Sequence, residues 1–212
     1  MNPLAQGGLS RAPSLPVVPP LRDGENHFFL SHYRLNAGQN CTILKLALEK
    51  AGYSAWFDNG AGVLPTVQGM RDGVAKSHTF LLYLSREVFT RQFVLIEIQH
   101  AIRLGKRFIL VMEENQRKFQ SQVDGTMKPC ACSMEEFKKQ MPSQLAGPLF
   151  KHTSFIPYRE HETEQEAMVK RILDAYKNAC SIPKTEVGDF LDLNLENDEI
   201  ASGFIATFKH GV

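Results

Sequence analysis

The sequence predicts an α/β domain: a flavodoxin-like, five-stranded parallel sheet with helices on both faces. Strand-like runs alternate with helical segments five times, and the clearest run is apolar on both faces, as parallel sheets require. Right-handed crossovers then favour the strand order 2-1-3-4-5. In such a sheet ligands bind at the carboxyl ends of the strands, beside the switch point between the first and third strands.

The first half of the chain contains two strand–helix pairs. They follow residues 1–25, a Pro- and Gly-rich leader that we expect to be disordered. The predicted elements are a strand at 27–31, a helix at 38–51, a strand at 53–57 and a helix at about 67–76. Gly52 is expected to end the first helix, and Asp58-Asn59-Gly60 is a turn signal that ends the aromatic second strand.

The second half repeats the alternation three times. The predicted elements are a strand at 78–85, a helix capped by Thr90 and ended by Gly105, a strand at 107–112, a helix at 133–141, a strand at 153–158 and a helix at 164–179. The polar segment 113–130 is predicted to be a loop. The closing helix is amphipathic, with one stripe formed by Met168, Ile172, Ala175 and Tyr176.

Composition places this domain, residues 26–180, among ordinary globular proteins. The acidic and apolar tail at 181–212 is expected to be a solvated linker. A net charge of +1 gives no indication of nucleic-acid binding or of a polybasic membrane anchor. No apolar run approaches the ~20 residues of a membrane span. Four unevenly spaced cysteines do not resemble a disulfide framework, so we expect a reducing, cytoplasmic location.

Several functions of doubly wound sheets lack their motifs here. The turn after the first strand, SHYRLNAG, has one glycine, which disfavours a dinucleotide-binding fingerprint. The chain has no phosphate-binding G-x-x-x-x-G-K-[ST] loop and no G-x-S-x-G elbow, and Ser85 stands where a receiver domain carries its phospho-acceptor Asp. Cys130 and Cys132 lack the spacing of a zinc site, so no metal is expected.

Glu97 stands within an otherwise apolar segment, FVLIEI (93–98). A carboxylate in such a run is either partly desolvated or directed into a cleft, and both perturb its pKa. Phe93 lies one helical turn earlier on the same face. The alternative is a solvated glutamate in the first turns of a helix, where the macrodipole favours an acid. Spacing alone favours this alternative.

Five segments in order resemble the TIR family. They are FFLSHYR (28–34), LEKAGYSAWFD (48–58), GMRDGVAKSHTFLLYLS (69–85), FVLIEIQHAIRLGKRFILV (93–111) and IPYREHETEQEAMVKRIL (156–173). The resemblance extends from about residue 27 to residue 179. Within the family, the sequence is similar to stand-alone domains of protists and algae. Each segment alone is weak evidence for the family, but five segments in the family's order are specific to it.

The resemblance implies an enzyme that cleaves NAD⁺ as its substrate and needs no cofactor. In TIR domains of this type the acid on the third helix is catalytic, and Glu97 matches it. Nicotinamide leaves as a neutral base, so one carboxylate suffices to hold the ribose hydroxyls and stabilise the oxocarbenium-like transition state. The products would be nicotinamide and ADP-ribose or a cyclic isomer.

Around this acid the resemblance implies a substrate pocket. Phe93 matches an aromatic wall, and Arg34 matches an arginine near the pyrophosphate or ribose, with a solvated loop charge as its alternative. His32 and Tyr33 border the same loop, and Trp56 is either core or cleft wall. Asp58 is interpreted as a turn-forming residue rather than a catalyst.

A second interpretation is a non-catalytic signalling module that acts by homotypic contact. Receptor-type animal members of that kind commonly lack the acid, which favours catalysis here. The loop 59–69 carries no acid, whereas several active members have one there. The family also implies self-assembly and partnership with other TIR domains, in signal transduction and innate immunity.

Overall fold

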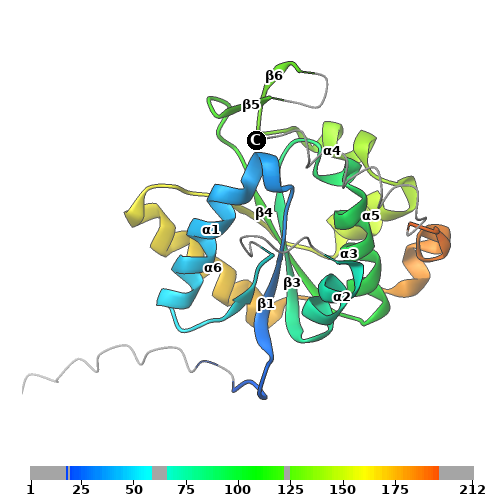
Figure 1. Ribbon diagram of the computed structural model, residues 1–212, viewed down its shortest axis with the longest axis horizontal. Helices are drawn as coiled ribbons and strands as arrows, with labels where there is room; N and C mark the ends of the chain where they lie inside the picture. Colours follow the sequence, from blue (N-terminus) through cyan, green and yellow to red (C-terminus); the bar gives the residue numbers. More distant parts are fainter. Residues whose placement is uncertain (1–17, 19, 59–65, 122–124, 196–212) are drawn as a thin grey trace, which may run out of the picture.

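Within the residues that the structure describes (18, 20–58, 66–121 and 125–195), the computed structural model places five parallel strands in one central sheet (Figure 1). The strands are β1 (Asn26–Ser31), β2 (Ala55–Trp56), β3 (Ser77–Leu84), β4 (Arg107–Met112) and β7 (Phe155–Pro157). Their order is β2-β1-β3-β4-β7. Since β7 is the fifth strand of this sheet, the predicted α/β fold and the order 2-1-3-4-5 are confirmed.

Helices cover both faces of the sheet, as Figure 1 shows. One face carries α1 (Arg34–Lys50) and α6 (Glu162–Asn178). The other face carries α2 (Val67–Ala75), α3 (Gln92–Arg103), α4 (Met134–Gln140) and α5 (Ser143–Lys151). Each face has its own buried apolar cluster, because successive residues of a strand point to opposite faces. In β3, for example, Phe80 and Leu82 face α3, whereas Leu81 and Tyr83 face α1.

Helix ends agree with the glycine signals but not with the predicted cap. Gly52 and Gly105 have φ values of +87° and +64°, in the left-handed region that glycine adopts without strain. Helix α3 begins at Gln92 after Arg91, whose side chain makes no cap hydrogen bond. Thr90 lies instead in a 3₁₀ turn, and its Oγ1 donates to the carbonyl of Glu87, so it is not the cap of α3.

The segment predicted to be a loop contains a small hairpin. Strands β5 (Phe119–Ser121) and β6 (Met127–Pro129) pair in antiparallel fashion, and the hairpin projects beyond the carboxyl edge of the main sheet (Figure 1). Strands of three residues are too short to show an alternating pattern, so the sequence does not reveal them. Helix α5 was also not predicted, because Gly147 and Pro148 lie inside it and both disfavour helix.

The acidic tail packs on the body of the domain as far as it is described. Ile182, Val187 and Phe190 are buried in the cluster beneath α3 and α5. The Gln99 amide of α3 donates to the carbonyls of Phe190 and Leu193, at 2.8 and 3.0 Å. The expectation of a solvated linker is therefore wrong for 181–195, while 196–212 and most of the leader lie outside the described residues.

None of the helices in the described ranges combines the length and apolarity that crossing a membrane requires.

Candidate functional site

Glu97 lies buried between α3 and the sheet. Helix α3 turns Ile98 and Ala101 into the apolar cluster, and Glu97 shares that buried side with only 8% of its surface exposed. The Ser31 hydroxyl, on the last residue of β1, donates to Oε2 of Glu97 at 2.5 Å. Because Ser31 pairs in register with β3, this hydrogen bond lies at the predicted switch point.

The environment of Glu97 favours its neutral form. Burial raises the pKa of Glu97 to about 8; the hydrogen bond from Ser31 opposes this rise, and the charge of Asp58 adds to it. The solvated glutamate that spacing alone favours is therefore not what the structure contains.

Asp58 follows β2 and stands half-buried beside the same edge. Burial raises the pKa of Asp58, and the Arg34 charge opposes that rise. Arg34 is the exposed first residue of α1, so it follows β1 closely but lies in the helix rather than in the predicted loop, because α1 begins at Arg34 instead of residue 38. The fold thus brings Ser31, Asp58, Glu97 and Arg34 to one place, although they come from the ends of two strands and from two helices.

His32 faces the other side of the sheet from Ser31. Its ring packs at 4.9 Å from the ring of Phe57, and its buried Nε2 has no hydrogen-bond partner among the described residues. Burial and the Arg34 charge lower the pKa of His32 to about 4. His32 is therefore neutral at physiological pH, and Nε2 can still donate or accept one hydrogen bond.

Tyr33 is held by a cation–π contact. The Arg91 guanidinium lies over the Tyr33 ring, 4.0 Å from its centroid, and Arg91 is also paired with Glu87. Arg91 directly precedes α3, so this contact joins the start of α1 to the start of the helix that carries Glu97.

Trp56 packs as a core residue. Its ring stacks on Phe29 at 4.6 Å with an interplanar angle of 9°, and Gly73 of α2 lies directly against it. Phe93 stands one turn before Glu97 on α3 and is partly exposed. Direct roles for Trp56 and Phe93 in binding a substrate remain predictions.

A further buried acid lies at the same edge but on the α1 face. Glu113 is 2% exposed and accepts hydrogen bonds from Asn40 Nδ2 and the Tyr83 hydroxyl, at 2.8 and 2.9 Å. Lys118 also donates to Asn40, so this network ties the stem of the β5–β6 hairpin to α1. The polar groups of Asn40, Tyr83 and Lys118 thus find hydrogen-bond partners within the network around Glu113, which indicates a structural role for this acid.

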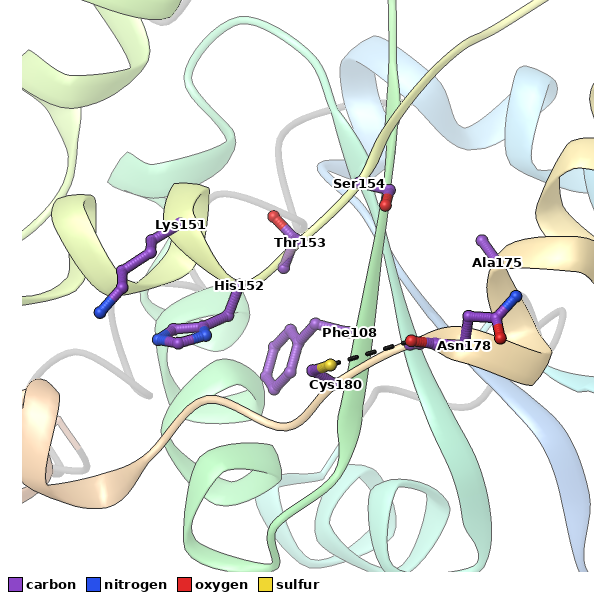
Figure 2. Close-up of a pocket in the computed structure, with 9 residues that line it drawn as sticks. Phe108, Lys151, His152, Thr153, Ser154, Ala175, Asn178 and Cys180 are labelled. Atoms are coloured by element: carbon purple, nitrogen blue, oxygen red, sulfur yellow. Dashed lines mark hydrogen bonds between the residues drawn. The ribbon is translucent and has the colours of Figure 1, made fainter.

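The hollow shown in Figure 2 is remote from Glu97. It has a volume of about 240 Å³ and lies beside the start of β4, between α5 and α6, at the opposite edge of the sheet. Phe108 lines it together with Lys151, His152 and Cys180 (Figure 2). None of the site residues predicted from the sequence lines this hollow.

The cysteines do not assemble a metal site in the described part of the chain. Cys130 and Cys132 are buried, unpaired thiols, whereas Cys180 is exposed. Over the same ranges, no three His, Cys, Asp or Glu side chains come together as metal ligands.

Sequence reasoning missed two members of the site. Ser31 ends the predicted strand 27–31, and a polar residue that closes an apolar strand at a switch point is a recognisable signal. Asp58 was interpreted as a turn former, and only the pairing of β2 with β1 places it beside Glu97's partner Ser31.

Comparisons with solved structures give distant similarities. A metazoan TIR-STING receptor from C. gigas, solved with 2′,3′-cGAMP, has 13% identity and a TM-score of 0.47 over 73% of this chain and 42% of that receptor. The TIR domains of the activated Roq1 resistosome, which recognises the effector XopQ, have 12% identity and a TM-score of 0.47, over 71% of this chain and 98% of theirs. The CMP N-glycosidase BcmB of Clostridium botulinum has 20% identity and a TM-score of 0.40, over 69% and 98%.

These similarities are too weak to support an argument about function, and this chain spans less than half of the receptor's length. No curated protein matches the sequence. A family model described as TIR domain, however, matches residues 28–146, which is more than half of the 212 residues. On this match the chain belongs to the TIR domain family.

Proposed function

We propose that the protein is an NAD⁺ glycohydrolase in which Glu97 is the catalytic carboxylate. The reaction breaks the bond between nicotinamide and ribose, and it yields nicotinamide with ADP-ribose or a cyclic isomer. The observation that carries the proposal is the buried Ser31–Glu97 hydrogen bond at the carboxyl edge of β1. An acid kept in an apolar setting at a ligand-binding edge is typical of a functional residue.

The chemistry is compatible with a carboxyl that is neutral in the free protein. The pKa of Glu97 is about 8 there because of burial. The nicotinamide ring of NAD⁺ carries a positive charge, and an opposite charge nearby favours the ionised acid. The resulting carboxylate then stabilises the oxocarbenium-like transition state, and the ring nitrogen takes the electron pair of the broken bond.

Side chains around Glu97 supply the other contacts that we propose for the substrate. The Arg34 guanidinium is exposed and suits a pyrophosphate oxygen. Phe93 forms one wall of the pocket and Tyr33 borders its mouth, whereas the His32 ring faces the other side of the sheet. Trp56 supports the wall from below through its stack on Phe29.

The family resemblance further implies assembly. We propose that the site is completed between copies of the chain or with other TIR domains, in a cytoplasmic signalling role. Specific activity should then rise with protein concentration. The competing function is a TIR module that signals by contact alone.

Nicotinamide release from NAD⁺, followed by chromatography at high protein concentration with a crowding agent, separates the two functions. We expect release by the unmodified protein and a loss of about 100-fold or more in Glu97→Gln. The matched control is Glu166→Gln, which changes an exposed glutamate of α6 and should retain activity. No release under these conditions would leave the contact-only module as the better description.

A further inference from the structure

A second carboxylate lies beside the Ser31–Glu97 pair. In the register of β1 with β2, Phe28 pairs with Ala55 and Phe29 with Trp56. The segments that follow β1 and β2 stay side by side beyond the last paired residues, because the ring centroids of His32 and Phe57 are only 4.9 Å apart.

Side-chain alternation determines which face Asp58 occupies. Trp56 packs in the cluster on the α3 face, and Phe57 packs in the cluster on the α1 face. Asp58 is next in the alternation, so it returns to the α3 face, where Ser31 meets Glu97. The electrostatic effect of Asp58 on Glu97 is an independent indication that the carboxyl groups are close.

Glu97 and Asp58 differ in solvent exposure, as a mechanism that gives the two carboxyl groups different roles requires. Glu97 is buried, with 8% of its surface exposed, while Asp58 is half-buried and therefore accessible to a water molecule. Burial raises the pKa of Asp58, as suits a group that accepts a proton, and the neighbouring Arg34 charge opposes that rise and favours the ionised form. Different environments for two neighbouring carboxyls commonly mark different catalytic roles.

We propose that Asp58 is the general base that activates the attacking water, while Glu97 stabilises the ribosyl cation. This inference rests on the proposed NAD⁺ hydrolysis. The bond from C1′ to nicotinamide breaks first, and its electron pair neutralises the pyridinium nitrogen. The water oxygen then bonds to C1′, and a water proton passes to an Asp58 carboxylate oxygen and from there to solvent. NAD⁺ and water thus give nicotinamide, ADP-ribose and one proton.

The test compares two reactions of the same intermediate. Exchange of labelled nicotinamide into NAD⁺ needs only cleavage and re-formation of the C1′–N bond, whereas appearance of ADP-ribose also needs an activated water. In Asp58→Asn, hydrolysis should fall by about 100-fold or more, and exchange should change by less than about threefold. Azide, a nucleophile that needs no deprotonation, should restore turnover of this variant and give an ADP-ribosyl azide.

Three further variants make the result interpretable. Asp58→Glu should recover part of the hydrolysis, since it retains a carboxylate. Asp174→Asn, on the exposed surface of α6, should leave both reactions unchanged. Glu97→Gln should lose both reactions, because the cation no longer forms. Circular dichroism of each variant checks that the fold is intact.

The outcomes are distinct. Equal loss of exchange and hydrolysis in a folded Asp58→Asn, or no effect on either, would show that Asp58 only shapes the turn and would overturn the inference while NAD⁺ cleavage stands. A wild type that makes only a cyclic product would overturn it as well, because no water attacks. A wild type that neither exchanges nor hydrolyses would overturn the proposed function itself.

Discussion

At the scale of single residues, the proposed chemistry rests on the Ser31 hydroxyl and the Glu97 carboxyl. They lie 66 positions apart in sequence and 2.5 Å apart in space. Burial and this hydrogen bond act on the Glu97 pKa in opposite directions, and burial prevails. The free protein therefore carries a largely neutral Glu97 at pH 7, and the ionised fraction grows with pH.

The pH dependence of the proposed catalysis follows from this balance between burial and the hydrogen bond. If the carboxylate is the active form, kcat/KM for NAD⁺ should rise with pH and level off above a pKa of about 8. Ser31→Ala removes a hydrogen bond that lowers the pKa, so its profile should shift to higher pH, with a rate at pH 7 about tenfold lower. Initial rates between about pH 6 and 9.5 measure both profiles.

A profile that falls with pH would contradict this assignment. It would make the protonated Glu97 the active form, as a general acid for a base that cannot leave unaided.

At the scale of elements, β2 depends on a close contact between a helix and a ring. A Cβ on Gly73 of α2 would lie 2.6 Å from Cε2 and 2.7 Å from Cδ2 of Trp56. Only glycine allows α2 this near to the Trp56–Phe29 stack, and that stack holds the two-residue β2 against β1. The position of Asp58, two residues beyond Trp56, therefore depends on Gly73.

Gly73→Ala should destabilise the protein. The clash with Trp56 should cost about 1–3 kcal/mol, more than the gain of up to ~1 kcal/mol in helix propensity. The melting temperature should fall by several degrees, and the fluorescence of Trp56, the sole tryptophan, should report the displaced ring. Gly147→Ala in α5 is the matched control with the opposite sign, since its Cβ would meet no described atom within 4 Å. Equal melting temperatures for the two variants would refute the contact.

At the scale of the whole molecule, burial of Glu97 makes stability depend on pH. The pKa of Glu97 is about 8 in the folded protein and near its ordinary value of 4.5 when unfolded. Between these values the folded state binds more protons than the unfolded state, so the free energy of unfolding falls as pH rises. The stabilising contribution of a neutral Glu97 is complete below about pH 4.5 and is lost as pH rises through about 8.

Glu97→Gln removes this titration and retains an oxygen that accepts from Ser31. Its melting temperature should therefore exceed that of the unmodified protein by about 5 °C at pH 8, with little difference at pH 5. Calorimetry at several pH values measures the difference. Glu166→Gln, on the surface, should follow the unmodified protein throughout. Parallel curves for Glu97→Gln and the unmodified protein would exclude a buried, neutral carboxyl.

Much of the fold was predictable because its signals are local. The segments HTFLLYLS and RFILVM became β3 and β4 within one residue at each end, since a strand buried on both faces must be apolar throughout. The start of α3 was less predictable, because Arg91 precedes it without a cap hydrogen bond while Thr90 bonds within its own turn. The hairpin β5–β6 was missed because strands of three residues carry no period.

The sequence by itself determined the order of the strands, the family and the singular position of Glu97 within an apolar run. Tertiary structure alone decided that Ser31 donates to Glu97, that Asp58 comes near enough for its charge to act on Glu97, and that the tail around Phe190 packs under α3. The physical reason is the distance along the chain over which each kind of interaction acts. Periodicity and turn chemistry act between neighbours along the chain, whereas desolvation and hydrogen bonding of a buried acid depend on segments that only the folded sheet brings together.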